Sequence, residues 1–75
     1  MREARTMFTQ RFQNNKHKAT VVGMAYVTNT LNARKRTFER TVYEFEGDLV
    51  VMMNGNARDF HKVGETEDGH LIGWV

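Results

Sequence analysis

Four cations in the middle of the chain form the side-chain cluster with the clearest chemistry. Arg34, Lys35 and Arg36 are consecutive, and Arg40 follows Arg36 by four residues. Clustered lysine and arginine side chains neutralise phosphates, and the planar guanidinium group of arginine can bind a phosphate at two points. The cluster therefore indicates contact with a nucleic-acid backbone, unless it is only the solvated surface of a loop.

A second basic set lies nearer the start of the chain. Its members in the candidate phosphate-binding surface are Arg11, Lys16 and Lys18. If these side chains lie beside the central cluster, the two sets form one positive surface of the kind that binds nucleic acid. The alternative is that they belong to the solvated face of a helix and the loop that follows it.

Charge is distributed unequally along the chain. Residues 1–40 hold nine lysines and arginines and two acids, a net of +7, whereas residues 41–75 hold two bases and seven acids, a net of −5. Such asymmetry suggests an anionic partner for one face of the protein. The alternative is that the two parts interleave in space and their charges mix.

Residues that commonly serve catalysis or bind metals show no recognised arrangement. The chain has no serine and no cysteine, its six glycines are scattered as turn residues, and its three histidines lack metal-ligand spacing. Asp59 and His61 are two residues apart, and with Lys62 or Arg58 they offer a weak alternative, an RNase-like acid–base site. The sequence therefore predicts a non-enzymatic protein with no cofactor and no metal.

Length and composition predict one small domain over residues 1–75. The absence of cysteine is typical of a chain in a reducing compartment. The longest apolar run, residues 49–53, is five residues long, whereas a membrane-spanning helix needs about 20. We therefore expect a cytoplasmic protein that has no membrane partner.

Apolar periodicity and turn residues predict a short helix followed by strands. Ala4, Phe8 and Phe12 recur every four residues, which predicts a helix over residues 3–12. Gly23 indicates a bulge in the first strand, and Asn54-Gly55 is a hairpin turn sequence. The strands expected from β-branched and aromatic content are 19–28, 49–53, 57–63 and 70–75.

Residues 30–46 fit two structures. One is a loop followed by a strand over 36–46, and the other is a helix whose apolar stripe would include Leu31 and Phe38. The β-branched and aromatic residues at 41–43 favour the strand, because they lose rotamer freedom in a helix. The predicted fold class is mostly β (α+β), with a short N-terminal helix and a four- to five-stranded antiparallel meander. This meander is either open or closed into a small SH3-like or OB-like barrel.

Two functions from different classes agree with these features. The favoured one is a small module that binds nucleic acid through a basic surface. The alternative is a regulator or inhibitor, of the type that viruses and mobile elements carry, which occludes a larger host protein. Its anchors would be Trp74, Phe60 and Met52, since aromatic and methionine side chains suit such interfaces. A homodimer through the apolar strand 49–53 is a further expectation, because pairing would hide its edge.

Overall fold

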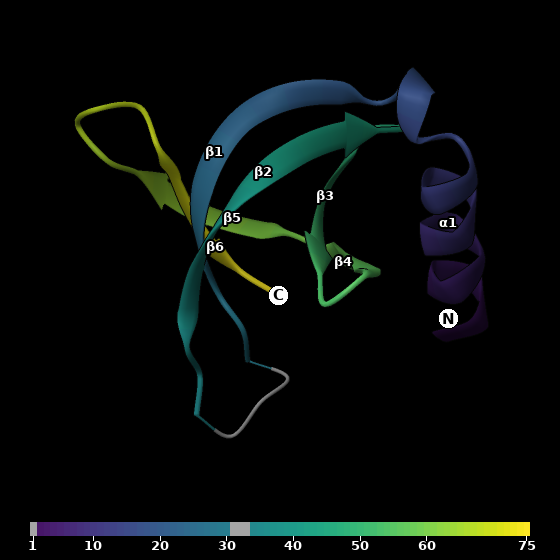
Figure 1. The fold of residues 1–75 in the computed structure, drawn as a ribbon, viewed down its shortest axis with the longest axis horizontal. Helices are drawn as coiled ribbons and strands as arrows, with labels where there is room; N and C mark the ends of the chain where they lie inside the picture. The colour runs from purple at the N-terminus through teal and green to yellow at the C-terminus, as the bar shows by residue number, and fades with distance from the viewer. Residues whose placement is uncertain (1, 31–33) are drawn as a thin grey trace.

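The computed structural model describes residues 2–30 and 34–75, with helix side chains from residue 6 onward. These residues form a helix, a short 3₁₀ turn and six strands (Figure 1). In chain order they are α1 (Arg2–Asn14), η1 (Lys16–Lys18), β1 (Thr20–Thr28), β2 (Thr37–Phe45), β3 (Asp48–Met53), β4 (Asn56–Asp59), β5 (His61–Glu65) and β6 (Leu71–Trp74). The predicted mostly β (α+β) class is therefore confirmed.

The six strands form one strongly bent, mixed sheet with the order β4-β3-β2-β1-β6-β5. Strand pairs are antiparallel as expected, except that β6 lies parallel to β1. The segment expected as one strand over 57–63 is divided at Phe60, since its first part pairs with β3 and its second part with β6. The division gives six strands, and the sheet stays open between β4 and β5.

The ambiguous segment is a strand. β2 pairs with β1 from Thr37 opposite Thr28 to Glu44 opposite Thr20, so cross-strand pairing adds to the local preference of residues 41–43 for extended backbone. The register shifts between Val21 and Gly23, which confirms the predicted bulge. Leu31, which belonged to the helical alternative, lies outside the described residues.

Helix α1 covers one face of half the sheet. Phe8 and Phe12 are buried against Phe45, Val50 and Ala57, as their spacing predicts. The helix is longer than residues 3–12, because the polar residues that follow Phe12 continue it to Asn14 before the chain turns through η1. The opposite face of the sheet encloses a second core.

That second core lies inside the bend and explains the unbroken apolar run of β3. Val51 and Met53 point into it, whereas Val50 points toward α1. A strand buried on both faces needs no polar alternation. Since β3 also lies between β2 and β4, it offers no free edge for the homodimer expected at residues 49–53.

The helices in the described part of the chain were also compared with the requirements of a membrane span. None of them is both long enough and apolar enough to cross a bilayer.

Candidate functional site

One half of the outer sheet surface is apolar and open to solvent. We call it the β1–β6–β5 face and define it by the exposed side chains of Met24, Tyr26, Ile72, Trp74 and Val63. Met24 and Tyr26 alternate along β1, and Tyr26 lies beside Ile72 in the parallel register with β6. Trp74 is 40% exposed and Val63 is 68% exposed. Large side chains of this kind, gathered on neighbouring strands, mark an interaction surface more often than scattered single ones do.

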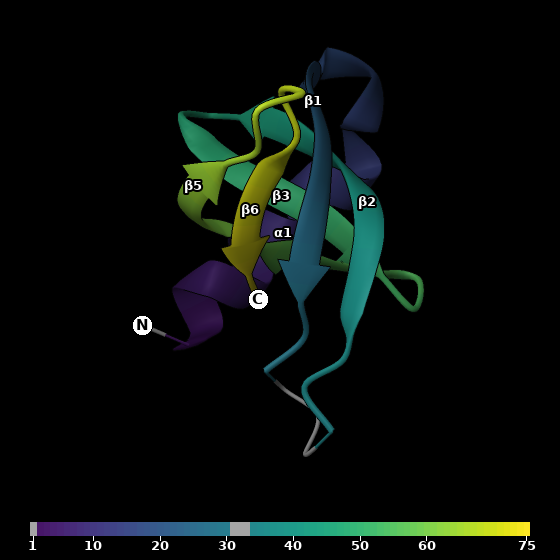
Figure 2. The ribbon, with the colours of Figure 1, turned by 90° about the vertical axis from the view of Figure 1, so that its left-hand side faces the viewer.

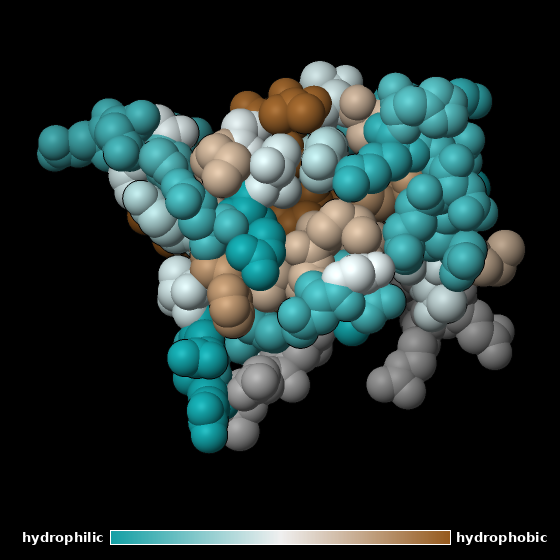
Figure 3. All heavy atoms as spheres, viewed as in Figure 1, coloured by the Kyte–Doolittle hydropathy of each residue, from teal (hydrophilic) through white to brown (hydrophobic). Residues whose placement is uncertain are grey.

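The face is exposed because α1 lies elsewhere. α1 packs over β2, β3 and β4 through the cluster that contains Phe12, whereas β5, β6, β1 and β2 lie side by side on the opposite side of the molecule from α1 (Figure 2). No segment among residues 2–30 and 34–75 covers Ile72 or Trp74, which both remain exposed. Hydrophobic atoms also reach the surface over the arch of β1 (Figure 3), where Val21 and Val22 are exposed.

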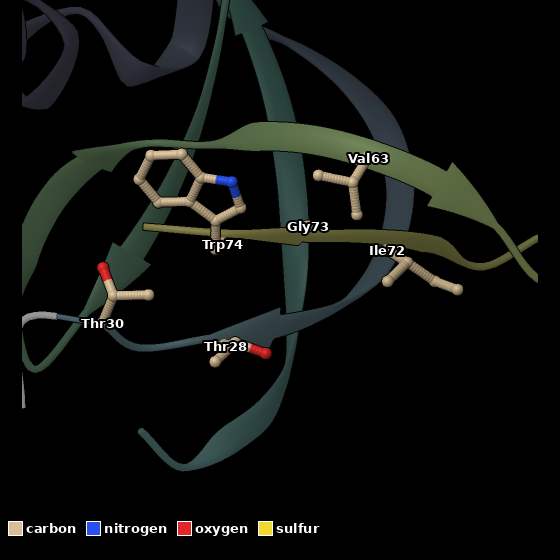
Figure 4. Close-up of a pocket in the computed structure, with 6 residues that line it drawn as sticks. All are labelled: Thr28, Thr30, Val63, Ile72, Gly73 and Trp74. Carbon is tan, nitrogen blue, oxygen red and sulfur yellow. The ribbon is translucent and has the colours of Figure 1, made fainter. Parts of the chain in front are cut away.

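Trp74 forms the wall of a shallow hollow at one end of this face. The hollow has a volume of about 430 Å³ and is lined by Thr28, Thr30, Val63, Ile72, Gly73 and Trp74 (Figure 4). The indole ring stacks on the ring of His61, with centroids 4.0 Å apart. The Thr30 hydroxyl donates a hydrogen bond to the Val75 carbonyl oxygen. Its lining is thus mainly hydrocarbon, with a hydroxyl already satisfied at its rim.

Tyr26 at the centre of the face is held by a network around His70. The two rings stack with centroids 4.7 Å apart, His70 Nε2 lies 3.0 Å from a Glu39 oxygen, and Nδ1 lies 3.1 Å from an Asp68 oxygen. The hydrogen bond to Glu39 and then that to Asp68 raise the pKa of His70 above its usual 6.5. Hydrogen bonds from Thr66 and from the His70 backbone lower the pKa of Asp68. The network ties the β5–β6 turn to β2 across β1.

This network predicts that His70→Gln lowers stability more in mild acid than in mild base. A group whose pKa is raised by folding stabilises the folded state fully below its unfolded pKa, here about 6.5, and loses this contribution as the pH rises through the raised value. We expect the urea midpoint of His70→Gln to fall further below wild type at about pH 5.5 than at about pH 8.5. The control is His17→Gln, at an exposed histidine of η1, and an equal pH dependence for both variants would contradict the assignment.

The cations predicted to bind phosphate do not form one surface. Lys16 and Lys18 lie in η1 before β1, whereas Arg34, Lys35 and Arg36 follow its far end. β1 has nine residues, which span about 30 Å. The two sets therefore lie at opposite ends of the β1–β2 hairpin (Figure 1).

Three of these cations also have contacts within the protein. Arg11 forms an ion pair with Glu46, at 2.7 Å, and both groups are close to half exposed. The Lys16 ammonium lies 5.4 Å from the centre of the Tyr43 ring, and the Arg40 guanidinium lies 5.0 Å from that of Phe38. The consecutive cations 34–36 are exposed and lie at the same end of the sheet as the Trp74 hollow, because Trp74 is beside Thr28 in the register.

The three predicted protein-binding anchors have different environments. Trp74 lies on the β1–β6–β5 face, but Phe60 is 5% exposed and packs in the inner core. Met52 is partly buried against the α1 cluster. Sequence reasoning missed Ile72 and Val63 as members of the surface, although the apolar residues at both parities of 71–75 were a usable signal that both faces of β6 are apolar.

The residues of the RNase-like alternative lie at another hollow. Asp59 and His61 line it together with Asp48, and its volume is about 400 Å³. The described residues contain no group of three histidine, cysteine, aspartate or glutamate side chains arranged to hold a metal ion. No protein-family model, no curated protein and no solved structure matches the chain.

Proposed function

We propose that this protein is a non-enzymatic binding module that docks onto another protein through its β1–β6–β5 face. The observation that carries the proposal is the exposed group of Met24, Tyr26, Ile72, Trp74 and Val63, over which no described segment folds. The same side of the sheet is covered by α1 where β2, β3 and β4 form it. A partner surface would bury the uncovered half as α1 buries the other half.

The composition of the face favours a protein partner over a phosphate backbone. Aromatic and methionine side chains are enriched at the centre of protein interfaces, whereas charged groups stay at the rim. Here the centre holds Tyr26 and Ile72, and the charged side chains of Glu39 and Lys62 lie beside it. Trp74 beside an apolar hollow is the kind of anchor that carries much of the binding energy in such surfaces.

The test is capture of protein partners from a nuclease-treated lysate of the source cells by three immobilised forms of the protein. Ile72→Glu places a charge at the centre of the face, and Met7→Glu places the same charge on an exposed methionine of α1, 65% exposed. A protein retained by wild type and by Met7→Glu, with at least a tenfold lower affinity for Ile72→Glu, would support the proposal. Equal retention by all three forms would contradict it, provided that circular dichroism shows all three to be folded.

Nucleic-acid binding remains the second candidate, because the exposed cations 34–36 lie at the same end of the sheet as Trp74. Phosphate contacts there would be salt-dependent, and an aromatic ring nearby can stack on an unpaired base. Replacing Lys35 and Arg36 with alanine should then reduce the slope of log affinity against log salt by about 2 for single-stranded DNA. The same replacement of Lys16 and Lys18 is the control, and no binding by wild type at low salt would exclude this candidate.

A further inference from the structure

We propose that the β1–β6–β5 face binds a second copy of this chain, related to the first by a twofold axis that turns it end for end. The proposal rests on the proposed function, because it names a partner for the same face. It is carried by a second observation, the opposite charge of the two ends of the face.

The basic end follows the last residue of β1. Lys35 and Arg36 are exposed there, and the backbone N–H of Asn29 donates to the Arg36 carbonyl oxygen, which extends the hairpin beyond the sheet. The hollow at Trp74 opens at this end. In Figure 1 the β1–β2 hairpin extends beyond the body of the molecule.

The acidic end is the turn between β5 and β6. Glu65, Glu67 and Asp68 are exposed in or beside it. Because β6 is parallel to β1 and its residue Trp74 lies beside Thr28, the turn that precedes β6 lies at the other end of the face from the basic loop. Figure 2 shows the two segments at opposite ends of β6 and β1.

This polarity distinguishes two ways in which equal faces can meet. A twofold axis between the faces and parallel to the strands would place one basic loop against the other, and like charges held close together disfavour a complex. An axis between the faces that runs across the strands places each basic loop against the partner's acidic turn. A twofold interface contains every contact twice, so both ends are then complementary.

The apolar centre would form the body of the same interface. Tyr26 and Ile72 are neighbours across β1 and β6, midway between the charged ends, so they meet their own counterparts near the axis. Four strands at a spacing of about 4.8 Å and nine residues of about 3.3 Å each give a face of roughly 14 by 30 Å. This is smaller than the about 800 Å² per partner of a standard interface, and we therefore expect dissociation in the micromolar range.

The first measurement is the molar mass of the wild-type protein by sedimentation equilibrium from about 1 µM to about 1 mM, concentrations that span the expected dissociation constant. We expect a monomer–dimer equilibrium in wild type and in Met7→Glu, and a monomer throughout the range in Ile72→Glu. The intrinsic fluorescence of Trp74, the one tryptophan of the chain, should change with dimerisation. A wild-type monomer at every concentration would overturn the proposal.

Charge reversal tests the end-for-end arrangement directly. One variant carries Lys35→Glu and Arg36→Glu, and the other carries Glu65→Lys and Glu67→Lys. Each variant alone would set like charges against each other at both ends and should dimerise at least tenfold more weakly than wild type at low salt. Their equimolar mixture should recover dimers of wild-type affinity, because acid then meets base at both ends. Dimers that are equally strong in each variant alone and in the mixture would overturn this arrangement.

The outcomes for the dimer and for the proposed function can be told apart. A monomeric wild type together with a captured protein that Ile72→Glu loses would remove the dimer and leave the face as a site for a different protein. A mixture that fails to recover dimers, while Ile72→Glu still abolishes them, would overturn the charge pairing. Dimers unaffected by Ile72→Glu would place self-association on another surface and overturn the proposal.

Discussion

Phe12→Ala is expected to lower the free energy of unfolding by about 3–5 kcal/mol, as for other large-to-small replacements in protein cores. Phe12 has no exposed surface, and its ring lies 5.5 Å from that of Tyr43 and 5.7 Å from that of Phe45, centroid to centroid. These contacts attach α1 to β2. Alanine would remove them and leave a cavity between helix and sheet.

The size of the domain makes this loss decisive. Typical stabilities of about 0.05–0.15 kcal/mol per residue give a chain of this length only about 4–11 kcal/mol. Urea unfolding followed by circular dichroism should show a partly or fully unfolded population of Phe12→Ala in the absence of denaturant. Met7→Ala, at an exposed position of the same helix, should stay within about 0.5 kcal/mol of wild type. A similar small effect for Phe12→Ala would show that α1 does not stabilise the sheet.

Gly73→Ala is expected to be destabilising by about 3 kcal/mol or more, above the usual range for overpacked cores. A Cβ atom at this position would lie 2.5 Å from the Phe60 ring and still closer to the His61 backbone carbonyl oxygen. A ring can shift, but the carbonyl belongs to β5, which is paired with β6. The methyl group would therefore push apart two strands that support the Trp74 hollow.

The matched control is a glycine on the neighbouring strand. A Cβ atom at Gly64 would meet nothing within 4 Å, so Gly64→Ala should change the free energy of unfolding by no more than about 0.5 kcal/mol. Thermal and urea unfolding of both variants compare them directly. Equal stabilities would mean that β5 and β6 can separate without cost, which would contradict the close packing at Gly73.

The turns were predictable because their signals are local. Asn54 and Gly55 have φ values of 52° and 81°, the positive values that a tight hairpin between β3 and β4 requires. Gly47 and Gly69 likewise have positive φ in the turns before β3 and β6. Gly73 has a different role, since it accommodates the packing of Phe60, and no neighbouring residue in the chain indicates that contact.

The candidate site was predictable only in part. Trp74 was among the expected anchors and lies on the exposed face, whereas Phe60 lies in the inner core. The two residues are close in type, and their sequence neighbours do not separate them. What separates them is side-chain direction on a bent sheet, where one face encloses a core and the other is covered by α1 only in part.

The sequence by itself determined the class of the elements and where most of them turn, because backbone preferences and apolar periodicity depend on residues near one another in the chain. Tertiary structure alone decided which apolar strand is exposed and which cations are neighbours. β3 and β6 both carry apolar residues at both parities, yet β3 is buried on both faces under α1 and the inner core, while β6 keeps Ile72 and Trp74 in solvent. The physical reason is that burial depends on the layer that lies over a face, and the length of β1 holds the two basic sets apart.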